Sequence, residues 1–209
     1  NAIMGFSNLL IDDLEEKGYF ELAKYAENIN NASERTLNLL ANLLDWARSQ
    51  TGAIEYKPTV INLSEVVTKT IELYQFNASQ KSITIENELR EYIFVLADKA
   101  MLETVLRNLI SNAIKYSNSK GEVKIEAEQV GVETIVSIRD NGIGIPKKHI
   151  HKLFSIDGKY STLGTMNEYG TGLGLILCKK FIKKNNGKIW AESNLNEGSI
   201  FYFSLPASH

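Results

Sequence analysis

The chain has 209 residues, of which 44% are hydrophobic and 23% charged, and this composition excludes a disordered chain, a collagen and a coiled-coil rod. Its 23 basic and 25 acidic residues give a net charge of −2, which argues against nucleic acid or an acidic membrane as a partner. The single cysteine, Cys178, excludes an internal disulfide framework and a cysteine-based zinc site.

Residues 1–52 are predicted to form two helices separated near Gly18. The second helix carries a seam with alternating steps of four and three residues: Ile29, Ser33, Thr36, Leu40, Leu43 and Ala47. Two helices of this length cannot bury their apolar faces alone, so we expect half of a four-helix bundle completed by a second copy of the chain. Packing of these helices on the rest of the same chain is the alternative.

Residues 58–207 are predicted to form a second domain after a linker between Gly52 and Pro58. Helices are expected after a cap at Asn62, over 98–117 and over 173–184; strands are expected over 82–88, 92–97, 122–129, 133–139, 188–193 and 199–205. This order predicts an α+β fold, an α/β sandwich with a mostly antiparallel mixed sheet and helices on one face.

The first candidate functional segment is Asp140-Asn-Gly-Ile-Gly-Ile-Pro146, which follows a predicted strand. Asn141-Gly142 alone would also suit a hairpin turn. However, the residues after it do not alternate as a returning strand would. A carboxylate at a strand end, beside glycines that let backbone come close, can instead accept a hydrogen bond from the exocyclic amine of a purine.

The second segment is Gly170-Thr-Gly-Leu-Gly-Leu175, at the start of a predicted helix. Free N–H groups and the positive end of the helix dipole at such a start suit phosphate. The segment is neither a Walker loop nor a dinucleotide-binding fingerprint. Close packing at a helix entry is the alternative reading.

The third segment lies inside the helix predicted over 98–117. Asn108 and Asn112 are one turn apart on one face, and Lys115 follows on the same side. An amide oxygen on Mg²⁺ and a lysine near phosphate would explain this pattern, because Mg²⁺ takes few protein ligands and completes its shell with water and substrate phosphates. Hydrogen bonding to a neighbouring loop is the alternative.

Together, in this order, the three segments resemble the ATP-binding domain of sensor histidine kinases, a branch of the superfamily that includes DNA gyrase, the mismatch-repair ATPase and the large heat-shock chaperone. The segments that carry the resemblance are 108–116 (asparagine box), 140–144 (first glycine box), Leu153-Phe154 (phenylalanine box), 170–174 (second glycine box) and Gly198-Ser199 with Phe201 (last box). Residues 1–52 resemble the dimerisation and phosphotransfer helices, cut just after the acceptor histidine.

The resemblance implies a site for ATP and Mg²⁺. Asn112 would ligate the metal, Asn108 would support the metal or its waters, and Lys115 would contact phosphate. Tyr116 would pack near the adenine or ribose, and Asp140 would accept from the adenine amino group. The other implied nucleotide contacts are Gly142, Gly144, Ile145, Gly170, Thr171, Gly172, Leu173, Gly174 and Ser199. Residues 155–169 would form a lid, with Lys159 as the cation near the γ-phosphate.

The activity implied by the resemblance is transfer of the ATP γ-phosphoryl group to a histidine and then to an aspartate of a response-regulator receiver domain. The parent would act as a homodimer through the N-terminal helices. It would be cytoplasmic, or this would be the cytoplasmic part of a membrane-anchored sensor, with no membrane contact by this fragment. Because the acceptor histidine would precede Asn1, we expect the chain to bind nucleotide without phosphorylating itself.

Two other functions are compatible with the sequence. One is a non-catalytic, nucleotide-sensing dimeric module. The other is a gyrase-type ATPase, but in the gyrase-like branches a glutamate that activates water stands where this chain has Asn108. An amide cannot take up a proton, which favours phosphoryl transfer over ATP hydrolysis.

Overall fold

The computed structural model describes residues 2–50, 55–90, 92–155, 162–166, 168, 170 and 172–208. The chain divides into two compact units, Asn1–Thr51 and Gly52–His209, which we call the helical unit and the sandwich unit. Among the helices of the described ranges, none combines the length and apolar character needed to cross a membrane.

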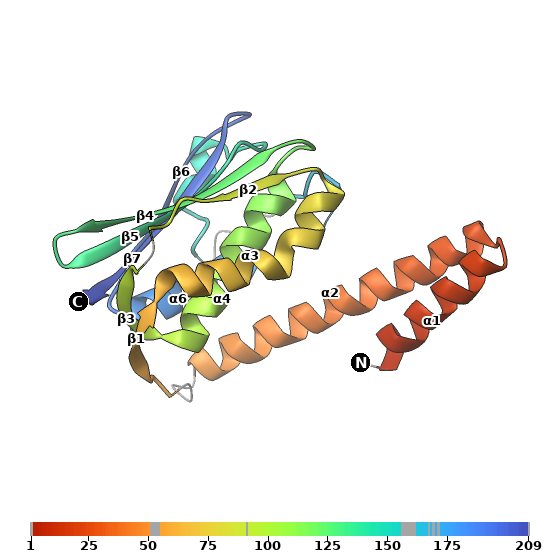
Figure 1. The fold of residues 1–209 in the computed structure, drawn as a ribbon, viewed down its shortest axis with the longest axis horizontal. Helices are drawn as coiled ribbons and strands as arrows, with labels where there is room; N and C mark the ends of the chain where they lie inside the picture. Colours follow the sequence, from red (N-terminus) through yellow and green to blue (C-terminus); the bar gives the residue numbers. More distant parts are fainter. Residues whose placement is uncertain are drawn as a thin grey trace. The chain divides into compact units, whose positions relative to one another are not determined.

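The helical unit is a hairpin of α1 (Ala2–Glu16) and α2 (Phe20–Gln50). Figure 1 shows α1 folded back along α2. Gly18 lies between the helices at φ +74°, a left-handed conformation that suits a helix end. Ala23 and Ala26 are buried in the hairpin, so small side chains allow the two helices to approach each other.

Many large apolar side chains of the helical unit are exposed. They are Ile3, Phe6, Leu9, Leu10, Tyr19, Phe20, Leu22, Tyr25, Ile29, Leu37, Leu40, Leu43 and Leu44. The set includes residues of the predicted seam, so the hairpin does not bury its own seam.

The sandwich unit alternates strands and helices. Its elements are β1 (Pro58–Asn62), α3 (Leu63–Gln80), β2 (Thr84–Asn87), β3 (Phe94–Asp98), α4 (Lys99–Tyr116), β4 (Glu122–Val130), β5 (Glu133–Asp140), α5 (Lys147–Ile150), α6 (Gly174–Lys184), β6 (Ile189–Asn194) and β7 (Gly198–Ser208). The predicted elements are present, with ends that differ by a few residues. Strand β1 was not predicted from the sequence.

The strands form one sheet in the order β1-β3-β7-β5-β4-β2, with β6 also paired to β7. The pairing of β2 with β4 is parallel and the other pairings are antiparallel. Figure 1 shows α3, α4 and α6 together on one face of this sheet. The predicted α+β fold, with a mostly antiparallel mixed sheet and helices on one face, is therefore confirmed.

Helix α4 supplies the centre of the core. Asp98 caps it by accepting a hydrogen bond from the Met101 N–H at 3.1 Å. One stripe of the helix is fully buried against the sheet and includes Leu102, Leu106 and Leu109. This stripe fixes the rotation of the helix about its axis, so the face that carries the two asparagines lies beside the core.

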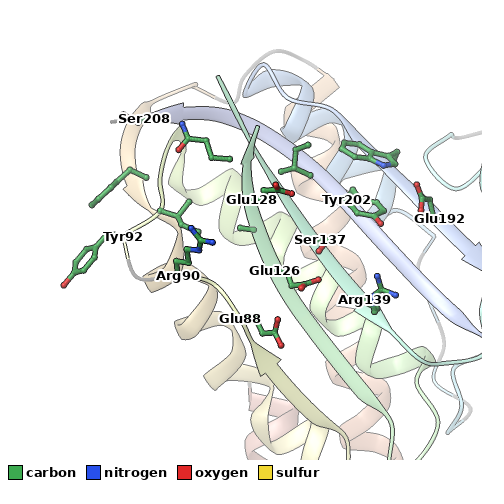
Figure 2. Close-up of a pocket in the computed structure, with 16 residues that line it drawn as sticks. Glu88, Arg90, Tyr92, Glu126, Glu128, Ser137, Arg139, Glu192, Tyr202 and Ser208 are labelled. Atoms are coloured by element: carbon green, nitrogen blue, oxygen red, sulfur yellow. The ribbon is translucent and has the colours of Figure 1, made fainter. Parts of the chain in front are cut away.

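The opposite face of the sheet is open and polar. Figure 2 shows Glu126 and Glu128 of β4 beside Ser137 and Arg139 of β5 on this face. A shallow cavity of about 1050 Å³ lies over it. Because side chains alternate along a strand, charged residues here and apolar residues on the helix-covered face come from the same strands.

Candidate functional site

Asp140 ends β5, where the alternation of side chains turns it toward the helix-covered face. Val136 and Ile138 are buried on the same side, and Asp140 itself is only 4% exposed. Its Oδ1 accepts hydrogen bonds from the N–H of Gly142 at 2.9 Å and of Ser199 at 3.2 Å. The register of the sheet supports this arrangement, because Ser199 of β7 pairs directly with Asp140.

The ionisation of Asp140 is shifted by its surroundings. Burial raises the pKa of its carboxyl group from the usual 3.8 to about 6, although the hydrogen bonds from Gly142 and Ser199 act in the opposite direction. The group is therefore ionised at neutral pH. Among the hydrogen bonds between described residues, both that it accepts go to Oδ1, so Oδ2 can accept from a ligand.

The turn that follows β5 packs closely against the end of α4. The Ile143 N–H donates to the carbonyl of Tyr116 at 3.1 Å. A Cβ on Gly142 would collide with the same carbonyl, and one on Gly144, which has φ +66°, would collide with the carbonyl of Asn194. Glycine at these two positions lets the turn lie directly on neighbouring backbone.

Ile145 is held by Ser193, a residue that was not predicted from the sequence to belong to the site. Its N–H donates to Ser193 Oγ at 2.8 Å, and that hydroxyl donates to the carbonyl of Gly198 at 2.7 Å. Ser193 Oγ also lies 3.0 Å from Ser199 Oγ. The turn after β5 is thus tied to β6 and to the start of β7.

The four predicted residues of α4 lie half-buried beside its core stripe. The Lys115 ammonium lies 4.6 Å from the centroid of the Tyr116 ring, within range of a cation–π contact. The Asn108 amide donates to the carbonyl of Thr104 at 2.8 Å. Within the described part of the chain, no hydrogen bond engages the Asn112 amide, so its oxygen can bind a ligand.

The second glycine segment meets α4 at Asn108, because a Cβ on Gly174 would lie against Asn108 Oδ1. Helix α6 begins at Gly174, with Leu173 as its N-cap residue. Gly172 has φ +71°, and a Cβ there would meet no described atom within 4 Å. Gly170 is exposed.

Contacts therefore connect most of the predicted site residues. Ser199 contacts Asp140, Asp140 contacts Gly142, and Gly142 lies on Tyr116 at the end of α4. Two turns earlier on the same helix, Asn108 meets Gly174. Of the remaining predicted residues, Lys159 and Thr171 lie outside the described residues.

A second cavity, of about 840 Å³, borders Asp140 and Ser199 near α5. No residue of α4 or of the second glycine segment lines either this cavity or the one on the open face. The candidate site is therefore defined by the contacts described above. No group of three or more His, Cys, Asp or Glu side chains among the described residues is arranged to hold a metal ion.

The family model for histidine kinase-, DNA gyrase B- and HSP90-like ATPases matches residues 97–209, more than half of the chain, and the chain belongs to this family. The matched region begins at the end of β3 and includes α4, both glycine segments and β7.

Comparison with individual proteins narrows the class. The chain is 35% identical over 170 residues to the phytochrome-like protein Cph1 of Synechocystis, covering 80% of the chain and 22% of Cph1. It is 34% identical to the catalytic domain of the histidine kinase ThkA, with a TM-score of 0.62, covering 73% of the chain and 96% of that domain. A structure of ThkA in complex with the response regulator TrrA matches 98% of the chain and 59% of its counterpart at 26% identity, with a TM-score of 0.71.

The chain thus comprises the ATP-binding catalytic domain of a two-component sensor histidine kinase, preceded by a pair of helices. It spans about a fifth of the length of Cph1.

Proposed function

We propose that this chain binds Mg²⁺–ATP at the candidate site, and that its parent transfers the γ-phosphoryl group to a histidine and then to an aspartate of a response-regulator receiver domain. The observation that carries the proposal is the connection of Asp140 to the α4 face through Gly142 and Tyr116. A carboxylate able to recognise a purine and an amide able to bind a metal thereby belong to one continuous structure.

We assign recognition of the adenine base to Asp140. Its ionised carboxylate has Oδ2 available to accept a hydrogen bond from the exocyclic amine of adenine. Gly142 and Gly144 hold the following turn close to α4, with Ile145 fixed by Ser193. In this proposal Tyr116 packs near the adenine or ribose, and Ser199 supports the carboxylate through its N–H.

We assign the phosphate and metal contacts to the α4 face and the second glycine segment. The Asn112 amide oxygen would ligate Mg²⁺, with Asn108 supporting the metal or its waters. When bound, Mg²⁺ would neutralise charge on the phosphate oxygens. Lys115 would contact phosphate, and Gly170, Gly172 and Gly174 would let backbone approach it, with Leu173 beside them. Thr171 and Lys159 are assigned by resemblance alone, as a nucleotide contact and as the lid cation.

Asn108 also supports transfer to a protein side chain over hydrolysis by a gyrase-type route. Its amide already donates to the carbonyl of Thr104, and an amide cannot act as the base that activates water. The chain therefore lacks a base at this position of α4.

The partners proposed for the parent are a second copy and a receiver domain. Self-association through the helical unit would cover the exposed leucines of α2, such as Leu40 and Leu43. A receiver-domain partner is suggested by the complex of the related kinase ThkA with a response regulator. We propose a cytoplasmic location for this part of the parent.

The metal assignment is tested by Asn112→Ala, measured by calorimetric titration of the full chain with a non-hydrolysable ATP analogue, with and without Mg²⁺. The wild-type chain should bind more tightly when Mg²⁺ is present. The variant should lose most of that gain, about tenfold for one ligand among several, while its Mg²⁺-free affinity stays within about twofold.

The matched control is Asn77→Ala, which removes an exposed asparagine of α3 and should change neither affinity. An unchanged Mg²⁺ effect in Asn112→Ala would contradict the metal role. A wild-type chain that binds no ATP analogue would contradict the proposed function as a whole.

A further inference from the structure

Lys81 is a buried lysine at the C-cap of α3, with only 4% of its surface exposed. Its ammonium donates to the carbonyl oxygens of Ile114 at 3.1 Å and Lys115 at 2.9 Å, both in the last turn of α4. Carbonyl groups in the last turn lack partners within the helix, and a cation there also interacts favourably with the helix dipole. Lys81 therefore completes the C-terminal end of the helix that carries the proposed phosphate and metal ligands.

The same ammonium holds a second segment of the chain, 84 residues away in sequence at Thr165. It lies 2.9 Å from Thr165 Oγ1 and 2.6 Å from Glu168 Oε1. The other oxygen of Glu168 accepts from the Met166 N–H at 2.8 Å. Burial raises the pKa of Glu168, but the hydrogen bonds from Lys81 and from backbone N–H groups outweigh it, so this pKa lies below its usual value.

Thr165 orients the contact. Its N–H donates to the carbonyl of Lys115 at 3.1 Å, and its hydroxyl donates to the carbonyl of Ser117 at 2.6 Å. With its proton directed at Ser117, that hydroxyl accepts from Lys81 through a lone pair. The threonine, the lysine and the end of α4 thus form one hydrogen-bonded cluster.

The held segment contacts two residues, Lys115 and Tyr116, that we propose to contact the nucleotide. The Tyr116 hydroxyl donates to the carbonyl of Thr162 at 3.4 Å. A Cβ on Gly164 would lie within 2.7 Å of the Lys115 side chain. The direction in which the Lys115 side chain points therefore depends on where the residues around Gly164 are fixed.

We propose that Lys81 is a positioning residue that, paired with Glu168, clamps residues 162–166 and Glu168 onto the end of α4 and so presents Lys115 to the phosphates of the nucleotide. The inference rests on the proposed function, because it assigns Lys81 a part in that site without contact to the nucleotide. It predicts an effect on phosphate-dependent affinity and none on recognition of the base, which falls to Asp140.

The test uses the full chain with Lys81→Met, Glu168→Gln and both substitutions together. Each single variant should bind an Mg²⁺–ATP analogue about 5- to 20-fold more weakly by calorimetry, and adenosine within about twofold of wild type. The double variant should be no weaker than the more affected single variant, because both remove the same pair. Glu168→Gln tests the pair even if Lys81→Met does not fold, since the Glu168 side chain is partly exposed, at 32%.

Matched controls are Lys69→Met and Glu72→Gln, which change exposed residues of α3 and should bind both ligands as wild type does. Equal weakening of the ATP analogue and adenosine in the Lys81 and Glu168 variants would indicate a merely structural role and overturn the proposal. Unchanged affinity for the ATP analogue would also overturn it.

Hydrogen exchange separates this inference from the proposed function. The amides of Gly164, Thr165 and Met166 donate hydrogen bonds within the cluster. They should lose protection by at least about tenfold in Glu168→Gln without nucleotide, while amides of β5 are unchanged. Loss of protection in a chain that binds no ATP analogue would support the clamp and contradict the proposed function, and retained protection would contradict the clamp.

Discussion

Leucine side chains occupy opposite environments in the two units. Leu106 and Leu109 of α4 are fully buried in the sandwich unit, whereas Leu40 and Leu44 of α2 are 51% and 50% exposed in the helical unit. The sandwich unit closes its core within one chain because three helices cover one face of the sheet. Among the described residues 2–50, the helical unit has two helices, and its apolar seam is exposed.

In the proposed function, this difference in burial assigns nucleotide binding to the sandwich unit and self-association to the helical unit. The proposed nucleotide site is built from elements that already pack against a complete core, so its side chains are positioned within a single chain. In the proposed function, the helical unit would bury most of its exposed apolar side chains by association with a second copy. Changes to one unit should therefore leave the task of the other unit nearly untouched.

The largest expected effect is on self-association. Leu40→Asp with Leu43→Asp removes four leucines from the interface of a dimer, since each copy contributes two. At about 1.5 kcal/mol or more for each buried leucine, dimerisation should weaken by at least about 10³-fold in sedimentation equilibrium. Affinity for an Mg²⁺–ATP analogue should stay within about twofold of wild type.

The control for this pair is Leu195→Asp, which changes an exposed leucine of the sandwich unit and should leave sedimentation unchanged. A double variant that sediments as wild type does would show that the seam is not the interface. A parallel loss of nucleotide affinity would break the division of tasks between the units.

A smaller effect is expected on the stability of the sandwich unit through Asp140. Its pKa is raised from 3.8 to about 6 in the folded protein, so the folded state binds the proton more tightly than the unfolded state does. The resulting stabilisation is present below pH 3.8 and is lost as pH rises through 6. Asp140→Asn removes this dependence, and its free energy of unfolding relative to wild type should rise by about 2 kcal/mol between pH 4.5 and pH 8.

This difference can be measured by urea denaturation in a Trp46→Phe background, where the fluorescence of Trp190 in β6 reports on the sandwich unit alone. Comparing the two proteins at each pH cancels the other titrating groups. If the free energies of unfolding of wild type and Asp140→Asn change in parallel with pH, burial does not raise the pKa of Asp140 as described.

The sequence was sufficient where a signal is local. The cap at Asn62, the helix over 98–117 and the break at Gly18 all follow from short-range spacing, and the structure confirms them. The two glycine segments were also visible locally, and their contacts with α4 bring the predicted residues together.

Other features depend on partners that are far apart in the chain. Strand β1 begins with Pro58 and has only five residues, so its identity rests on pairing with β3. The cluster around Lys81 joins residues 84 positions apart, and a lysine after a helix looks like an ordinary exposed cap. No periodicity marks such a contact, because it depends on tertiary packing.

The most direct test of the central claim is base selectivity at Asp140. Calorimetric titrations of the full chain should compare ATP and GTP analogues in Mg²⁺, with Asp140→Asn and the exposed control Glu128→Gln. Adenine offers an amine to the carboxylate, whereas guanine places a carbonyl oxygen there. We therefore predict that the wild-type chain and the control prefer the ATP analogue by roughly 100-fold, and that Asp140→Asn loses most of this preference. Equal affinity of the wild-type chain for both nucleotides, or an unchanged preference in Asp140→Asn, would contradict the account.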